Sequence, residues 1–200
     1  LKDAIVQFGG GCTGEIISDE GLLITNHHCG YSGIHSLSTP ENNYLEDGYW
    51  ALNKEMELPV KGLKVRFMKS MEDVTPAFVK LKTKDEINAK RQELKDAAEK
   101  ANPHCTAMVT SFYNNNVFYL IVYKTYQDVR FVGAPPASLG KFGGETDNWM
   151  WPRHTCDFSL FRVYAGTDNE PAEYSPENVP LKPVRSLKVS LKGVRENDFA

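Results

Sequence analysis

The sequence lacks any cluster of Lys and Arg residues, and its 23 basic residues are outnumbered by 26 acidic ones, which gives a net charge of −3. A chain without a basic region offers no electrostatic footprint for a phosphate backbone, so we expect no nucleic acid partner. No apolar run approaches the roughly 20 residues of a transmembrane helix, and no segment has the pattern of a signal peptide. We therefore expect no membrane insertion.

Cysteine is also scarce, with four residues among 200. Four cysteines can form two disulfides or contribute to a metal site, and here no Cys-x-x-Cys spacing occurs. Cys12 and Cys29 flank the ends of adjacent predicted strands, which favours a disulfide between them and an oxidising compartment. Cys105 and Cys156 have no evident partners, and small buried thiols would explain them equally well.

The apolar content, in contrast, is sufficient for a core, with 41% hydrophobic and 11% aromatic residues. This composition excludes global disorder, and the length suits one β-rich domain that carries an insertion. The chain opens on Leu1 rather than Met and stops just after a strand-like run, so we expect it to be a portion of a longer protein.

Short alternating segments separated by turn residues predict a mainly β fold with some α, either a barrel or a sandwich. The expected strands cover residues 4–8, 15–18, 22–25, 57–68, 105–112, 117–126, 129–133, 157–165 and 187–191. Thr83 and Glu86 form a predicted capping box for a charged helix that ends near Lys100. Its apolar stripe is thin, so we interpret residues 84–100 as a helical insertion on the surface.

The segment from Cys12 to Cys29 is the most informative part of the chain. Two short strands joined by a Gly turn lead directly into His28. Chymotrypsin-type barrels present their general base in this way, at the end of a buried strand and beside a disulfide. We predict that His28 is such a base, in preference to a structural histidine at a strand end, whereas His27 is expected to be structural.

A carboxylate that could orient His28 occurs in the second half of the chain. Asp157 precedes an alternating run in which it shares a face with Ser159, Phe161 and Val163. An acid on such a face is expected to be buried and paired. Asp147 is the competing carboxylate, but its surroundings are those of an exposed polar loop.

Two other interpretations start from the same residues. Gly-Tyr-Ser-Gly around Ser32 resembles a nucleophile motif, but Ser32 follows His28 by four residues and would share a helical face with it. A zinc site is the rival class, with His28, Cys29, His154 and Cys156 as two nitrogen and two sulfur ligands. Its spacing is unusual, since adjacent His and Cys residues are awkward simultaneous ligands.

Four longer motifs resemble bacterial dipeptidyl-peptidase 7 and dipeptidyl-peptidase 11. They are Gly-Gly-Gly-Cys-Thr-Gly (9–14), Thr-Asn-His-His-Cys-Gly-Tyr (25–31), Asp-Val-Arg-Phe-Val-Gly-Ala-Pro-Pro (128–136) and Gly-Lys-Phe-Gly-Gly-Glu-Thr-Asp-Asn-Trp-Met-Trp-Pro-Arg-His-Thr (140–155). The resemblance implies a homodimeric serine exopeptidase with a chymotrypsin-like double β-barrel, a helical cap domain and no cofactor, located in the periplasm, at the cell surface or outside the cell. Residues 1–200 would then be the portion bearing the His and Asp, without the second barrel and the cap.

By the same resemblance, His28 is the triad base and Asp157 the triad acid. Asn148 and Trp149 would hold the free amino terminus of a peptide substrate, by a hydrogen bond and a cation–π contact respectively. Two departures stand out. The family's Gly-Asn-Ser-Gly-Ser-Pro type of nucleophile motif is absent from this chain, and Cys156 replaces the usual Gly before the acid.

These observations predict part of a serine-type dipeptidyl peptidase that is inactive by itself because its nucleophile lies elsewhere. The first alternative is a fragment of a trypsin-like endopeptidase, in which Asn148 and Trp149 would have no role at an amino terminus. The second is a zinc-stabilised or purely structural β-barrel without activity.

Overall fold

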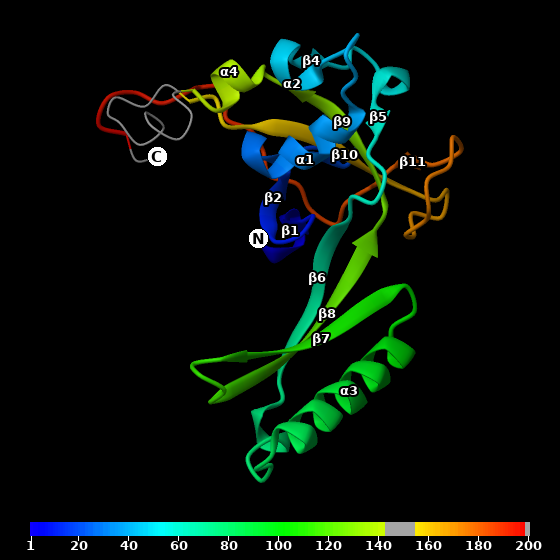
Figure 1. The fold of residues 1–200 in the computed structure, drawn as a ribbon, viewed down its shortest axis with the longest axis vertical. Coiled ribbons are helices and arrows are strands. Elements are labelled where there is room, and N and C mark those ends of the chain that lie inside the picture. The colour runs from blue at the N-terminus through cyan, green and yellow to red at the C-terminus, as the bar shows by residue number, and fades with distance from the viewer. Residues whose placement is uncertain (143–154, 199–200) are drawn as a thin grey trace.

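A computed structural model of the chain describes residues 1–142 and 155–198. Within these residues, eleven strands form one sheet in which every neighbouring pair is antiparallel. Helices occupy the connections between strands (Figure 1). The mainly β class with some α is therefore as predicted.

The strands are β1 (Ile5–Phe8), β2 (Cys12–Ile16), β3 (Leu22–Thr25), β4 (Tyr49–Trp50), β5 (Leu58–Pro59), β6 (Val65–Asp73), β7 (Cys105–Phe112), β8 (Val117–Tyr126), β9 (Asp128–Ala134), β10 (Ser159–Ala165) and β11 (Val179–Pro180). The α-helices are α1 (His27–Leu37), α2 (Tyr44–Asp47), α3 (Lys84–Ala101) and α4 (Ala137–Gly140). Short 3-10 turns occur at Lys2–Ala4, Lys54–Met56 and Thr75–Ala77.

The main sheet curls around a core, because buried residues of β8, β9 and β10 belong to one hydrophobic cluster. The order β9-β10-β3-β2-β1-β6-β8 ends on a strand that leads straight back into β9, with Gln127 as the only intervening residue. The short strand β5 also pairs with β9. We call this ring, with α1, α2 and α4, the main lobe (residues 1–68, 125–142 and 155–198).

Strand alternation fills the main lobe with apolar side chains. In β10, Ser159, Phe161 and Val163 are fully buried while the residues between them are half-buried, as the period of two requires. The ring of Phe161 lies 4.8 Å from that of Phe8 and 5.4 Å from that of Phe131, measured between centroids. These aromatic side chains join strands that are distant in sequence.

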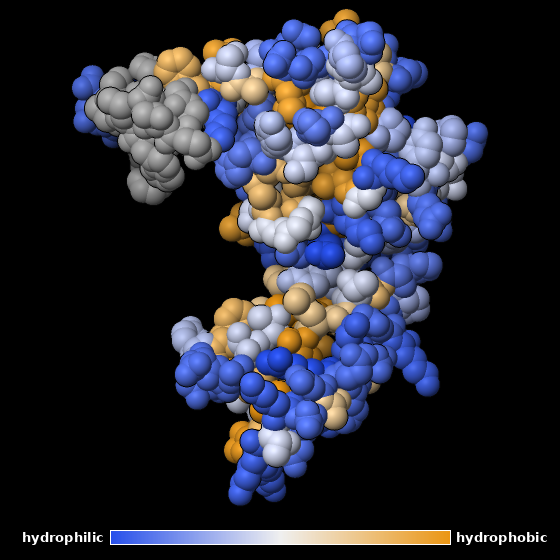
Figure 2. Space-filling view, viewed as in Figure 1, coloured by the Kyte–Doolittle hydropathy of each residue, from blue (hydrophilic) through white to orange (hydrophobic). Residues whose placement is uncertain are grey.

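Residues 69–124 form a second, smaller part that we call the hairpin lobe. The far ends of β6 and β8 extend out of the main lobe and pair with β7, and α3 packs along β7 (Figure 1). The predicted capping box is present, since Thr83 Oγ1 accepts from the Glu86 N–H and the Glu86 carboxylate accepts from the Thr83 N–H. Figure 2 shows hydrophilic residues over most of the α3 region, as its thin apolar stripe predicted.

One local prediction was wrong. No strand forms at residues 187–191, where one hydrogen bond from the Leu187 N–H to the Ile16 carbonyl replaces a ladder. Residues 57–68 were expected to form one or two strands with breaks at Pro59 and Gly62, and they form β5 and the first part of β6, separated by the turn around Gly62. Among the described helices, none combines the length and the apolar character required to span a bilayer.

Candidate active site

The pairing of β3 with β10 brings His28 and Asp157 together. Thr25, the last residue of β3, lies opposite Ser159, the first residue of β10. Because the strands are antiparallel, the chain leaving β3 and the chain entering β10 meet at one edge. His28 follows that edge by three residues and Asp157 precedes it by two, so side chains 129 residues apart in sequence become neighbours.

The sequence predicts His28 at the end of the strand β3. In the structure, His28 lies instead in the first turn of α1. Asn26 is the N-cap and helical geometry begins at His27. This turn approaches β10 closely at Gly30, where a Cβ would lie 2.7 Å from the Ser159 hydroxyl oxygen. A glycine at this position therefore lets the helix start directly against β10, the strand that follows the acid.

His28 and Asp157 make two contacts with each other. Nδ1 of His28 lies 2.8 Å from Oδ2 of Asp157, and the backbone N–H of His28 donates to Oδ1 at 3.1 Å. An ionised carboxylate only accepts hydrogen bonds, so the hydrogen of the neutral imidazole is on Nδ1. Nε2 is then left as the acceptor, which is the tautomer that a general base needs.

The charge of Asp157 is stabilised by several donors. Partial burial alone would raise the pKa of Asp157, but hydrogen bonds from the backbone and ring of His28, with its charge and the Asn26 amide, lower it below the ordinary value of 3.8. Asp157 also faces the N-terminal end of α1, where the helix dipole favours a negative charge. The carboxylate therefore remains ionised throughout the neutral range.

Asp157 was expected to be buried, and in this respect the prediction was wrong. Its side chain is 29% exposed and that of His28 is 65% exposed. The acid precedes the strand by two residues and therefore lies at the rim of the ring, outside the apolar core. The imidazole is thus oriented from one side and open on the other, where a reacting group can approach.

His27 adjoins His28 in the first turn of α1 but differs from it in burial. It is 1% exposed, and a Cβ on Gly140 would lie 2.5 Å from its ring. Burial lowers the pKa of His27, and a hydrogen bond with the backbone of Pro135 opposes this effect only in part. A neutral ring enclosed between α1 and α4 matches the structural role expected for this residue.

Cys12 and Cys29 form a disulfide that joins β2 to the first turn of α1. This bond removes Cys29 from the zinc ligand set considered above. The sulfur atoms of Cys12 and Cys29 and a nitrogen of His28 lie within 4.8 Å of one another, but sulfurs bonded to each other are not thiolate ligands. His154, another member of that set, lies outside the described residues.

Cys156 is an exposed free thiol and does not prevent the contact between His28 and Asp157. Its N–H donates to the Leu139 carbonyl, which links the segment before the acid to α4. Cys105 is a half-buried free thiol in β7.

Ser32 is exposed and lies on α1, one turn after His28, as its spacing predicted. Within residues 1–142 and 155–198, none of the hydrogen bonds joins its hydroxyl to His28. The predicted amine-binding residues Asn148 and Trp149, and the competing acid Asp147, lie outside the described residues. The nucleophile and the amine site therefore remain predictions.

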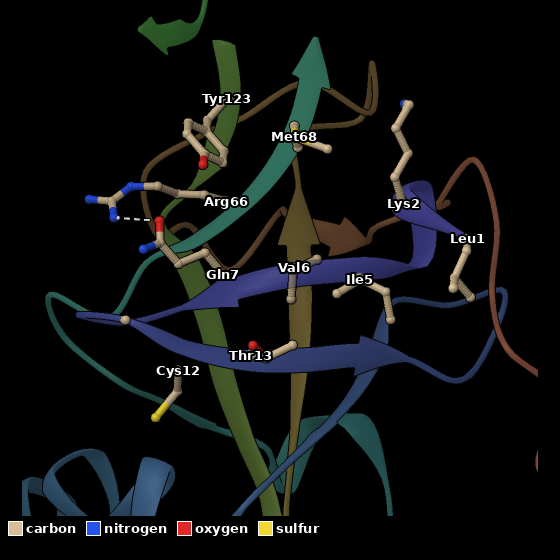
Figure 3. A pocket seen from close by; sticks show the side chains of 11 residues that line it. Leu1, Lys2, Ile5, Val6, Gln7, Cys12, Thr13, Arg66, Met68 and Tyr123 are labelled. Carbon is tan, nitrogen blue, oxygen red and sulfur yellow. Dashed lines mark hydrogen bonds between the residues drawn. The ribbon is translucent and has the colours of Figure 1, made fainter. Parts of the chain in front are cut away.

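A pocket of about 500 Å³ opens on the outer surface of β1 and β2 (Figure 3). Val6, Thr13 and Met68 line it, and at its rim the Arg66 guanidinium donates to the Gln7 side chain at 3.2 Å. None of its lining residues is a His, Asp or Glu. This pocket therefore offers no carboxylate–imidazole pair of the kind that His28 and Asp157 form.

Asn26 is the residue of this site that sequence reasoning missed. Its side-chain amide donates to Oδ2 of Asp157 at 3.1 Å and to the Asp157 carbonyl at 3.3 Å. The sequence signal was an Asn immediately before a helix start, which is a common N-cap. A cap pattern does not reveal a distant acceptor, so the contact could be found only in the folded chain.

All of the chain, residues 1–200, matches a family model described as Peptidase S46. The chain is 51% identical to dipeptidyl-peptidase 7 of Capnocytophaga gingivalis and 51% identical to the Asp/Glu-specific dipeptidyl-peptidase of Porphyromonas gingivalis. Both alignments cover 100% of this chain, but only 29% and 30% of the respective relatives.

A similar relation holds for solved structures. The crystal structure of Porphyromonas endodontalis DPP11 in complex with the dipeptide Arg-Glu is 44% identical, with a TM-score of 0.88, over 98% of this chain and 30% of that chain. The crystal structure of the same protein in an alternate conformation gives a TM-score of 0.85. The chain thus spans about 30% of the length of the relatives that it matches.

Proposed function

The chain belongs to the peptidase S46 family, and from this membership we propose that it is the His- and Asp-bearing portion of a serine-type dipeptidyl peptidase. The observation that carries the proposal is the 2.8 Å contact between Nδ1 of His28 and Oδ2 of Asp157, which leaves Nε2 open to solvent. Relatives named as dipeptidyl peptidases align with the full length of this chain at 51% sequence identity.

In the proposed reaction, Nε2 of His28 takes the proton of a serine hydroxyl as that oxygen attacks the scissile carbonyl. Asp157 stabilises the resulting imidazolium, and His28 then gives the proton to the leaving amine. Water hydrolyses the acyl-enzyme with His28 again acting as base. The mechanism uses no metal or organic cofactor.

The serine is proposed to come from a part of the longer protein that this chain does not contain. The relatives are more than three times as long as this chain, since it covers 29–30% of them. Ser32 is a poor nucleophile for His28, since both residues are on one helix and a substrate carbonyl must reach a serine held across a cleft. The isolated chain is therefore expected to have no peptidase activity.

The fold supports the same interpretation. The curled antiparallel sheet of the main lobe, with the base after β3 and the acid before β10, suits the first barrel of a chymotrypsin-like pair. A second barrel and a helical cap domain would lie outside this chain. A homodimeric assembly and a periplasmic location are proposed from the family resemblance, and the disulfide between Cys12 and Cys29 agrees with an oxidising compartment.

Dipeptide release requires that the free amino terminus of the substrate be held at a fixed distance from the scissile bond. Asn148 and Trp149 are proposed for that role. Crystal structures of one structural relative, Porphyromonas endodontalis DPP11, contain the dipeptides Arg-Glu and Arg-Asp, which supports a peptide substrate for this fold. Peptides with an unblocked amino end are therefore the proposed substrates.

The proposal is tested in the full-length protein that carries this segment, with a chromogenic dipeptidyl substrate. His28→Ala should lower kcat by roughly 10⁴-fold or more, because the serine loses its base. His35→Ala is the matched control, since His35 is an exposed histidine on the same helix, and it should retain activity. Full activity of the His28→Ala protein would refute the assignment.

A second measurement separates dipeptide release from endopeptidase cleavage. The same enzyme is given matched peptides with free and acetylated amino termini. Cleavage should be confined to the free peptides and should release dipeptides. Equal cleavage of both would favour the trypsin-like endopeptidase. Turnover by the isolated 200-residue chain that disappears in a Ser32→Ala variant would show that the nucleophile is in this chain.

A further inference from the structure

Asn26 occupies an N-cap position but does not cap its helix. The N-cap side chains of Asn43 and Asn53 accept hydrogen bonds from the N–H groups of Glu46 and Met56, in the usual manner. The side chain of Asn26 makes no such bond to α1. Its amide is instead directed at Asp157, where it donates to Oδ2 and to the backbone carbonyl.

Asp157 has taken over the capping role. Its Oδ1 accepts from the N–H of His28, in the first turn of α1, which an N-cap side chain would otherwise accept. Its Oδ2 is shared between Nδ1 of His28 at 2.8 Å and Nδ2 of Asn26 at 3.1 Å. The carboxylate is therefore fixed at both oxygens, and Asn26 provides the only one of these donors that lies outside His28.

We propose that Asn26 is a positioning residue, which holds the Asp157 carboxylate in the rotation that orients the His28 ring. This inference rests on the proposed function, in which His28 is the base. Without the Asn26 amide, Oδ2 would keep His28 as a donor but would lose the contact that limits rotation of the carboxylate. The second bond, to the Asp157 carbonyl, ties the backbone of the acid to the start of α1.

The backbone of Asn26 is itself held in place. Its carbonyl accepts from the Ser159 hydroxyl at 2.9 Å and from the Gly30 N–H at 3.2 Å. Ser159 is fully buried and belongs to β10, the strand that follows Asp157. Asn26 therefore connects α1 and β10, the two elements next to the base and the acid. Because its backbone is held by these hydrogen bonds, the position of its side-chain amide is restricted.

The test relies on substitutions that keep the N-cap but change the donor. Asn26→Ser and Asn26→Asp both introduce strong N-cap residues, so a merely structural capping role would survive them. The serine hydroxyl ends one bond short of the amide nitrogen that contacts Oδ2, and aspartate has no donor and places a second negative charge beside Asp157. Asn53→Asp is the matched control, because Asn53 accepts a hydrogen bond at its own cap and an aspartate can do the same.

The first readout is NMR of the 200-residue chain, which needs no nucleophile. The carboxyl signal of Asp157 should titrate at higher pH in Asn26→Ser, because its charged form has lost a donor, and higher still in Asn26→Asp. The downfield signal of the His28 Nδ1–H should weaken in both variants. Asn53→Asp should change neither signal. If the Asp157 titration and the Nδ1–H signal remain as in the wild type in Asn26→Ser, the inference fails.

The second readout is kinetic and uses the full-length peptidase. Asn26→Ser should lower kcat by about tenfold with little change in KM, the loss expected when a hydrogen bond to a charged group is removed. An unaltered kcat would contradict the positioning role. If the wild-type protein releases no dipeptides, the proposed function fails, whereas the NMR titration still decides whether Asn26 holds Asp157.

Discussion

Position 30 has no room for a side chain larger than the hydrogen of glycine. A Cβ at this position would lie 2.7 Å from the Ser159 hydroxyl oxygen and 3.0 Å from the Phe161 ring. Gly30→Ala should therefore lower the free energy of unfolding by about 1–3 kcal/mol, because the start of α1 must move away from β10. Urea denaturation measures this loss, and the Nδ1–H signal of His28 should shift as the helix moves.

The control for this substitution is Gly10→Ala. A Cβ on Gly10 would meet no atom within 4 Å. The free energy of unfolding of the Gly10→Ala variant should therefore stay close to that of the wild type. Alanine also favours helix over glycine, so propensity alone would make Gly30→Ala stabilising. A Gly30→Ala protein that is as stable as the wild type would show that the close approach of α1 to β10 is not required.

At the scale of single residues, the sequence allowed the pairing of His28 with Asp157 to be predicted, but not the residue that supports it. His28 and Asp157 were found because a histidine after a buried strand and an acid before an alternating strand are recognisable patterns. Asn26 was missed because its cap position predicts a bond within the helix, and the structure uses its amide elsewhere. The exposure of Asp157 was missed because alternation does not locate the rim of a ring.

The disulfide between Cys12 and Cys29 connects two elements of the site, β2 and α1. It closes a loop with a sequence separation of 17 residues, for which a reduction in unfolded-state entropy contributes about 3 kcal/mol. The double variant Cys12→Ser/Cys29→Ser should lose stability by about this amount in urea denaturation. Because Cys29 adjoins His28, the Nδ1–H signal of His28 should also broaden in this double variant.

Cys156→Ser is the appropriate comparison, since Cys156 is exposed and unbridged. Its stability should remain within about 0.5 kcal/mol of the wild type. Should the double variant unfold at the same urea concentration as Cys156→Ser, the bridge would contribute nothing to the stability of the folded chain.

Elements with local signals were predicted well, and those that depend on tertiary contacts were not. The hairpin of β7 and β8 and the helix α3 have clear alternation and a capping box, and their observed bounds agree closely with the prediction. Helix α1 contains glycines at positions 30 and 33 and was not predicted from residue 27, because packing of Ile34 rather than propensity stabilises it. Residues 187–191 alternate, but Leu191 is 96% exposed and no neighbouring strand covers them among the described residues.

At the scale of the whole molecule, the two lobes have separate cores of unequal size. The main lobe buries apolar side chains from seven of its strands, including the large Phe8, Phe131 and Phe161. The hairpin lobe buries fewer side chains: Ala98, Ala107 and Val122 form a cluster between α3 and its sheet, and Phe78, Phe118 and Ile121 are also buried there. Because the free energy of local opening follows the apolar surface that is buried, the hairpin lobe should be the less stable part.

Native-state hydrogen exchange tests this difference directly. Amides of residues 118–122 in β8 and 161–163 in β10 both lie in paired strands, so hydrogen bonding alone predicts similar protection. We expect the β8 amides to exchange about tenfold faster or more, which corresponds to an opening free energy lower by about 1.4 kcal/mol. The difference should remain in Gly10→Ala and diminish in Gly30→Ala, which weakens the main lobe alone. Equal protection in the wild type would mean that the two cores open as one cooperative unit, with the ribbon of β6 and β8 transmitting stability from the main lobe to α3.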